Sequence, residues 1–217
     1  VQPEEVVLVK GQLKIDQFAS DEDPKVLLKN SMTGESQQLQ LSRDDNSFVA
    51  VVKKEEAQQV LLQLEAKKAA FSAAPIRLAP NLDAEGVLQN EVSIELEHKD
   101  LESGEAYLIP HILFETASDR LDAQSELLIA SFAQYLLGAP SLRVQIQGHT
   151  DNVGDASANL DLSKRRAKRV AETIIDLGVS ANRISHGGYG ESRPVASNDS
   201  EVGRSQNRRT VFVVTAL

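Results

Sequence analysis

The first 98 residues alternate short apolar runs with turn-forming residues. The runs are of strand length and rich in Val, Leu and Ile, while Thr33-Gly34 and Asp44-Asp45-Asn46 separate them as turns. This spacing predicts an all-β sandwich over residues 1–98. The predicted strands are residues 6–9, 12–15, 25–28, 38–41, 48–52, 60–64, 76–78 and 92–96.

Helical periodicity begins beyond residue 107. Apolar residues three or four positions apart predict a helix that ends at Gly138 and a second that ends at Gly178. The predicted order is β-α-β-α-β-β, with helices on a small mixed sheet, and the whole chain is predicted to be α+β. The polar segment 98–105 favours two domains, 1–98 and 99–217. The strands of the second domain are predicted at 112–114, 144–147, 183–185 and 210–214, with a turn at 187–190.

Composition argues against several classes of protein. With 32 acidic and 23 basic residues and a net charge of -9, the chain is a poor candidate for binding nucleic acid. It contains no cysteine, so disulfides, thiolate metal sites and a lipidation cysteine are excluded from it. No apolar run approaches the roughly 20 residues of a membrane span. The first five residues lack the features of a signal peptide, which is consistent with a processed or truncated chain.

Residues typical of catalysis do not form a known pattern. The four histidines, at 98, 111, 149 and 186, show no metal-ligand spacing, and no Gly-x-Ser-x-Gly elbow is present. Gly187–Gly190 lacks a phosphate-loop pattern. A hydrolytic dyad of His149 and Asp151 is conceivable from their spacing alone. We expect a protein that is not an enzyme and that needs no cofactor and no metal.

Charged residues gather where the second helix is predicted to begin. Asp151 follows the strand at 144–147, and Ser163 is predicted to cap the helix, with Arg166 in its first turn. Cations at the positive end of a helix dipole each cost about 0.3–1 kcal/mol. Either neighbouring acids and solvent compensate these cations, or Arg166 and the free helix amides bind a carboxylate while Asp151 takes an ammonium. The cations are Lys164, Arg165, Arg166, Lys168 and Arg169.

Four motifs follow one another in the second half of the chain. On these motifs, from about Tyr107 to Val214, the chain resembles the peptidoglycan-binding domain of the OmpA C-terminal family, which includes peptidoglycan-associated lipoproteins and flagellar stator proteins. One departure is Glu115, where the family usually has Asp. The motifs are Thr150-Asp151 with Gly154; Asn159 with Leu162-Ser163, Arg166-Ala167 and Val170; Gly188-Tyr189-Gly190-Glu191 with Pro194; and Asn207-Arg208-Arg209.

The resemblance implies a non-catalytic periplasmic anchor for the cell wall. Its ligand would be the free amino-acid end of meso-diaminopimelate in the peptidoglycan stem peptide. Asp151 matches the position that binds the ammonium, and Arg166 matches the position that binds the carboxylate. Thr150, Asn159 and Leu162 match positions that line the pocket, and Thr116 falls in the loop that closes over it. Association with the outer membrane would come through a partner or a missing segment.

The residues alone leave a structural alternative open. Asp151 and Arg166 would then pair only with each other, and Asn159 would cap a turn. Of Arg208 and Arg209, one is predicted to make a structural ion pair and the other to face solvent or glycan.

The first half resembles a carboxypeptidase regulatory-like (transthyretin-like) β-sandwich. The resemblance rests on Val9-x-Gly11, Val26-x-Leu28, Thr33-Gly34-Glu35 and Asp45-Asn46-Ser47-Phe48. Asn46 stands where that family usually has Gly, and Asn tolerates a left-handed turn better than most residues. Such a domain would contact other envelope proteins. An alternative function is therefore an envelope-complex adaptor whose main role is docking through this sandwich.

Overall fold

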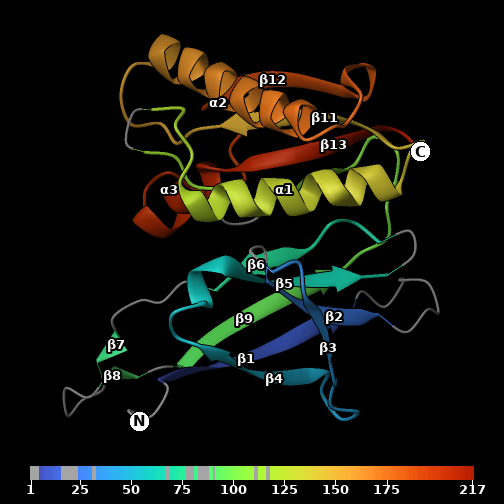
Figure 1. Ribbon diagram of the computed structural model, residues 1–217. Coiled ribbons are helices and arrows are strands. Elements are labelled where there is room, and N and C mark those ends of the chain that lie inside the picture. The colour runs from blue at the N-terminus through green and yellow to red at the C-terminus, as the bar shows by residue number, and fades with distance from the viewer. Residues whose placement is uncertain are drawn as a thin grey trace. The chain divides into compact units, whose positions relative to one another are not determined.

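The computed structural model divides into two compact units, residues 1–100 and 101–217 (Figure 1). The division lies two residues from the predicted boundary, and the independence of the two units as domains remains a prediction. The mixture of helices and several sheets confirms the α+β class. The structure describes residues 5–15, 24–30, 33–66, 69–76, 81–82, 88–89, 91–109, 112–115 and 118–217.

The first unit is built from two main sheets. Three strands have the order β4-β1-β9, and four have the order β3-β2-β5-β6. The two strands predicted at 6–9 and 12–15 are one continuous strand, because Gly11 keeps the register with both neighbours. Residues 77–78 of another predicted strand lie outside the described residues. The elements are β1 (Val6–Ile15), β2 (Lys25–Asn30), β3 (Ser36–Leu39), β4 (Ser47–Lys53), η1 (Ala57–Gln59), β5 (Val60–Glu65), β6 (Ala73–Pro75), β7 (Asn81–Leu82), β8 (Leu88–Gln89) and β9 (Glu91–His98).

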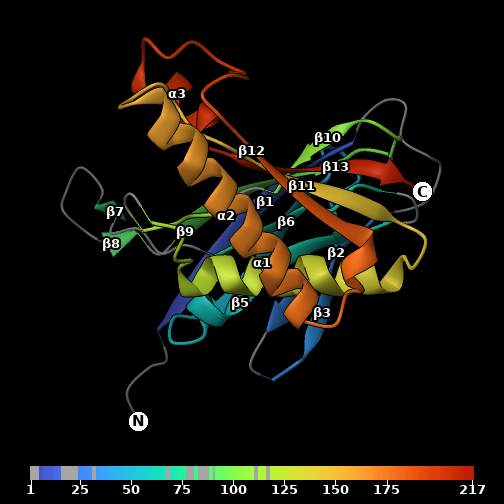
Figure 2. The same cartoon turned by 90° about the horizontal axis from the view of Figure 1, so that it is seen from above.

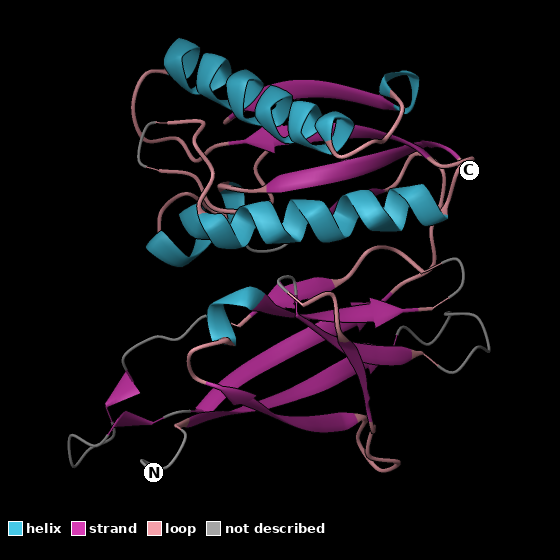
Figure 3. Cartoon of the chain, viewed as in Figure 1, coloured by secondary structure: helices cyan, strands magenta, loops and turns pink. Residues whose placement is uncertain are grey.

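The two main sheets of the first unit are separate (Figure 3). Residues of both sheets contribute to one hydrophobic core. Val7 and Val9 of β1 point inward by strand alternation, as Leu62 does from the other sheet. Asn46 has a φ of 55°, so it adopts the left-handed conformation expected of it. Two layers over one core are compatible with the predicted sandwich, while the relation to carboxypeptidase regulatory-like domains remains a prediction.

The second unit is a four-stranded mixed sheet with helices. Its strand order is β10-β13-β11-β12, and only the β11–β12 pair is parallel. The predicted first strand at 112–114 is wrong: Phe114 makes only an isolated bridge to Leu121, and β10 precedes it. The elements are β10 (Ala106–Leu108), α1 (Ala123–Gly138), β11 (Arg143–His149), α2 (Ala156–Asp176), η2 (Ala181–Arg183), β12 (Ile184–Gly190), α3 (Glu201–Asn207) and β13 (Thr210–Ala216).

Helices α1 and α2 cover the same face of this sheet (Figure 2). The ring centroids of Phe132 in α1 and Phe212 in β13 are 4.9 Å apart. Phe212 is opposite Ile146 of β11, and Gly148, two residues further, faces the backbone of α2 at Ser163. Because opposite residues and residues two apart share a face, both helices lie on one side of the sheet.

The end of α1 is held by a residue from far along the chain. The guanidinium of Arg183 donates to the carbonyl oxygens of Leu136 and Ala139, each at 2.7 Å, and to that of Leu142. The last turn of α1 has no basic residue of its own. Arg183 therefore satisfies carbonyl groups that the helix end leaves without partners and complements the negative end of its dipole.

Candidate functional site

Asp151 lies just beyond the carboxyl end of β11, as predicted, and is only 8% exposed. Its Oδ1 accepts a hydrogen bond of 3.1 Å from the backbone N–H of Val153. Its Oδ2 is 2.6 Å from Nη1 of Arg208. A buried carboxylate is costly unless it is paired and hydrogen-bonded, and these two contacts meet that need.

Arg208 is a site residue that sequence reasoning did not assign. Its second terminal nitrogen lies 2.6 Å from Oε1 of Glu201, so Arg208 joins the carboxylate of Asp151 to helix α3. Hydrogen bonds with Asp151 and Glu201 raise the pKa of Arg208. The Asn-Arg-Arg motif was the available signal, and it predicted that one of its arginines makes an ion pair. The partner could not be read from the motif, because Asp151 lies 57 positions earlier.

Asn159 ties the first turn of α2 to the loop after β11. Its side-chain Nδ2 donates to the backbone oxygens of Asp151, at 3.3 Å, and Val153, at 3.1 Å. The same nitrogen also lies 2.8 Å from the carboxylate of Glu191. Asn159 is buried, so these bonds fix the shape of the loop that carries Asp151.

The predicted start of the second helix is wrong. Helix α2 begins at Ala156, and its cap is Asp155, whose carboxylate accepts from the backbone N–H groups of Ser157 and Ala158. Ser163 is buried inside the helix, where its hydroxyl donates to the Leu160 oxygen and accepts from the Gly190 N–H. Arg166 consequently lies in the middle of α2. The free amides of the helix start are remote from it, and the predicted dipole penalty does not apply.

Arg166 is anchored to the segment that precedes α1. Its Nε donates to the backbone oxygen of Ser118 at 2.9 Å, and Nη2 donates to that of Glu115 at 3.4 Å. Its guanidinium carbon lies 4.8 Å from the ring centroid of Phe114. These contacts use two of the five N–H groups of an arginine. Burial lowers the pKa of Arg166, with the charges of Asp119 and Asp151 acting in the opposite direction.

Arg166 forms no ion pair within the described part of the chain. Asp151, the partner that the structural alternative required, is paired with Arg208 instead. Three N–H groups of Arg166 are thus left for an anion, and Asp151 is near enough for its charge to affect the pKa of Arg166. The arrangement offers a carboxylate and, near enough to interact with it, a guanidinium that has no ion-pair partner among the described residues.

Of the three remaining predicted site residues, the structure describes Thr150 and Leu162 but not Thr116. Thr150 is buried beside Asp151, and its hydroxyl has no hydrogen-bond partner among the described residues. Leu162 is half-buried on α2, one turn before Arg166. Thr116 lies outside the described residues. On either side of it, Glu115 and Ser118 supply the carbonyl oxygens that hold Arg166.

His149 does not form a catalytic dyad with Asp151. Neither of its ring nitrogens has a hydrogen-bond partner among the described residues, and the imidazole is stacked on the ring of Tyr189 with centroids 5.5 Å apart. Burial, together with the charges of Arg209 and Arg193, lowers the pKa of His149 to about 4. The imidazole is therefore neutral at pH 7.

This shifted pKa predicts a pH dependence of stability. The folded-state pKa of about 4 lies below the ordinary value of 6.5, so the contribution of neutral His149 is complete above pH 6.5 and is lost as the pH falls toward 4. The loss should amount to about 3 kcal/mol in free energy of unfolding. Urea denaturation at several pH values would measure it. His149→Gln should flatten this part of the curve, whereas His186→Gln, which removes an exposed imidazole from β12, should not.

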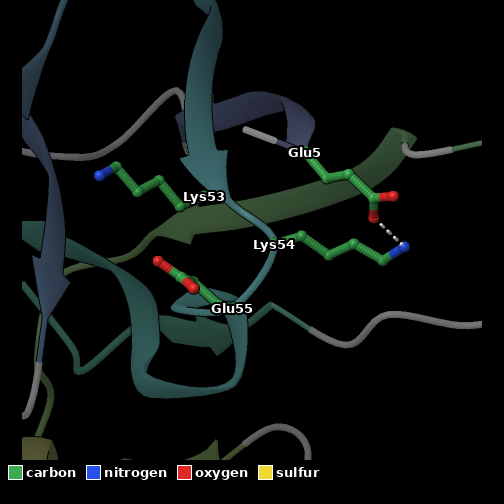
Figure 4. A pocket seen from close by; sticks show the side chains of 4 residues that line it. All are labelled: Glu5, Lys53, Lys54 and Glu55. Carbon is green, nitrogen blue, oxygen red and sulfur yellow. Dashed lines mark hydrogen bonds and ion pairs between the residues drawn. The ribbon is translucent and has the colours of Figure 1, made fainter. Parts of the chain in front are cut away.

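The first unit contains a charged surface pocket of about 380 Å³ (Figure 4). Lys54 and Glu5 form an ion pair of 2.6 Å across it, and the side chains of Lys53 and Glu55 point away from that pair. Exposed ion pairs contribute little free energy. Within the described ranges, no cluster of His, Cys, Asp and Glu is arranged for a metal ion. The helices described are also too short or too polar to cross a bilayer.

Comparison with known proteins identifies the second unit. Residues 113–208 match the OmpA family. The outer-membrane lipoprotein YfiB of Pseudomonas aeruginosa is 39% identical over 130 residues, which cover 60% of this chain and 75% of that protein. The peptidoglycan-binding protein ArfA of Mycobacterium tuberculosis is 43% identical over 82 residues, which cover 38% of this chain and 25% of that protein.

A solved structure adds a further similarity. The peptidoglycan-associated lipoprotein from Burkholderia pseudomallei is 33% identical, with a TM-score of 0.44, over 48% of this chain and 87% of that one. Residues 113–208, which match the family, include the loop of Asp151, helix α2 and the first two residues of the Asn-Arg-Arg motif. By its match to the family and its identity to YfiB, the chain belongs to the OmpA family.

Proposed function

We propose that this protein is a non-catalytic periplasmic anchor whose second unit binds diaminopimelate-type peptidoglycan. The observation that carries the proposal is the pairing pattern at the site. Asp151 has one arginine partner, Arg208, while Arg166 has no carboxylate partner among the described residues. An amino acid with an ammonium and a carboxylate on one carbon carries the two charges that the site would bind. Its carboxylate would pair with Arg166, and its ammonium would interact with Asp151.

Each charged group of the ligand would contact a side chain that still has free hydrogen-bonding positions. A carboxylate offers about four lone-pair positions, and Asp151 uses one for the Val153 N–H and one for Arg208. The remaining lone-pair positions of Asp151 would accept hydrogen bonds from the ammonium of the ligand. Arg166 would bind the ligand carboxylate through its free N–H groups, for which the planar guanidinium fork is suited.

Three further residues would shape the pocket. Asn159 would hold the Asp151 loop in place through its bonds to two loop carbonyls. The unpartnered hydroxyl of Thr150 would bond to the ligand. Leu162 would contact its aliphatic stem, and Thr116 would lie in the segment that closes over it.

The relatives support the proposed location and ligand class. ArfA is named as peptidoglycan-binding, and the Burkholderia protein as peptidoglycan-associated. YfiB is named as an outer-membrane lipoprotein. A periplasmic chain held near the outer membrane by a partner or by a further segment would fit these relatives, and it would tether an envelope protein or complex to the wall.

A second candidate function is docking to envelope proteins through the first unit. It is favoured by exposed valines on the outer face of β4, an edge strand of its sheet, where Val49 is 56% exposed and Val51 is 61% exposed. Val6, on the neighbouring strand β1, is also exposed. Exposed apolar side chains on an edge strand favour contact with another protein.

Sedimentation with isolated cell walls tests the proposed anchor function. The whole chain and a fragment of residues 101–217 should sediment equally with walls whose stem peptides carry diaminopimelate, because the proposed site lies wholly in the second unit. Residues 1–100 should stay in the supernatant. Walls whose stem peptides carry lysine are the matched control, since they keep an ammonium but lack the carboxylate for Arg166. Sedimentation of residues 1–100, or equal binding to both walls, would contradict the proposal.

A further inference from the structure

A second pocket lies in the same unit but on the opposite face of the sheet. It has a volume of about 510 Å³. Gln147 and His149 line it, and they alternate with Ile146 and Gly148, which face the helices. None of the described residues that line it belongs to the Asp151 and Arg166 site. It is lined by Ala106, Leu108, Gln147, His149, Arg193, Val195, Gln206, Arg209 and Val211.

Two arginines with no ion-pair partner among the described residues line this pocket. The guanidinium of Arg193 lies 3.8 Å from the ring centroid of Tyr189 and makes no hydrogen bond within the described part of the chain. Among the described residues, the guanidinium of Arg209 donates only to the backbone oxygens of Arg193 and Asn207. None of the described residues that line the pocket is acidic. The chain as a whole has more acidic than basic residues, so this local excess of positive charge stands out. A bound anion would neutralise it.

His149 provides an independent indication of a ligand. It is 4% exposed and lines the pocket, and both of its ring nitrogens are buried without a hydrogen-bond partner among the described residues. Buried polar atoms are nearly always hydrogen-bonded, to protein or to a bound group. A neutral imidazole carries one donor and one acceptor. An oxygen placed in the pocket would accept from the donor nitrogen.

The rest of the wall is apolar. Leu108 of β10 is 52% exposed and Val195 is 63% exposed, while Val211 of β13 is buried beneath the pocket. These side chains would contact the carbon skeleton of a ligand but would not bind a bare inorganic ion. The volume is within the range of about 300–1,000 Å³ that is usual for small-molecule sites.

We propose that this pocket binds an oxyanion attached to an apolar body, in the form of a carboxylate or a phosphate monoester. Arg193 and Arg209 bind the oxyanion, His149 donates a hydrogen bond to it, and Leu108, Val195 and Val211 contact the apolar body. Both oxyanions match the guanidinium fork, and the experiment separates them.

Titration of the whole ¹⁵N-labelled chain with four compounds that each carry a six-carbon chain tests the site. Hexanoate and hexyl phosphate should shift the amide signals of His149, Tyr189 and Val211, whereas hexanol and hexyltrimethylammonium should not. Tighter binding of hexanoate would assign the site to carboxylates, and tighter binding of hexyl phosphate would assign it to phosphate monoesters. Equal binding of hexanol, or no binding of either oxyanion, would overturn the proposal.

Variants locate the binding. Arg193→Gln removes an exposed cation and should weaken oxyanion binding by about tenfold or more, because charge-assisted hydrogen bonds are lost. Leu108→Asp places a like charge at the pocket and should abolish binding. The matched control is Arg169→Gln, which removes an exposed cation from α2 and should leave the affinity unchanged. Unchanged affinity in both Arg193→Gln and Leu108→Asp would show that the compounds bind elsewhere and would overturn the assignment.

Discussion

A Gly188→Ala variant is expected to lose a large part of the stability of the second unit. An added Cβ at this position of β12 would collide with the backbone nitrogen of Lys164 and lie 2.6 Å from its Cα. Backbone atoms inside a helix cannot move aside as a side chain can. Overpacking costs about 1–3 kcal/mol and occasionally more, and here we expect at least the upper value. A small domain has a total of only about 5–15 kcal/mol.

Urea denaturation followed by far-ultraviolet circular dichroism would measure the effect. The three α-helices of the described residues all belong to the second unit, so the helical signal reports mainly on that unit. Gly187→Ala is the matched control, because the nearest atom to its added Cβ is a side-chain carbon of Tyr189 at 3.6 Å, an ordinary contact. Similar midpoints for the two variants would mean that α2 is not held against β12 as described.

An Arg166→Ala variant is expected to bind a diaminopimelate stem peptide at least about tenfold more weakly. Charge-assisted hydrogen bonds contribute about 1.5–3 kcal/mol, and the variant also releases Ser118 and Glu115 from the guanidinium. Isothermal titration calorimetry would give the affinity. Arg166→Lys should restore only part of it, because an ammonium cannot reproduce the fork.

Two comparisons make this result specific to the carboxylate. Arg169→Ala removes an exposed arginine three residues further along α2 and should keep the affinity of the unaltered chain. A stem peptide that carries lysine should bind weakly to the unaltered chain and be little affected by Arg166→Ala. If the diaminopimelate peptide binds equally well to both forms of the chain, Arg166 does not belong to the site.

Periodicity predicted the long elements of the second unit well. The helix ends at Gly138 and Gly178 are confirmed, and Gly178 has the positive φ of a helix-ending glycine. Short elements were missed, because α3 has too few residues to show a period. The predicted turn at 187–190 is part of β12. Gly188 and Gly190 allow the close approach of α2, and glycines that serve this purpose look the same in a sequence as glycines of a turn.

The site was predictable where it depends on local order and unpredictable where it depends on distant contacts. Asp151 was placed correctly because a strand end is a local feature. The cap of α2 was misplaced because Asp155 and Ser163 are both good cap residues, and only packing of Ser163 beneath Gly190 decides between them. Arg208 was not assigned to Asp151 because that contact joins segments far apart in the chain.

The sheet order also determines when the second unit can be completed during synthesis. Strand β13, the last of the four strands of this sheet to be synthesised, lies between β10 and β11. Until Thr210–Ala216 is available, β10 has no neighbour in the described sheet and β11 has one open edge. Open strand edges are templates for pairing with other chains. A chain interrupted before residue 210 should therefore aggregate even though all three α-helices of the described residues have been made, because the edges of β10 and β11 stay open until translation has passed that point.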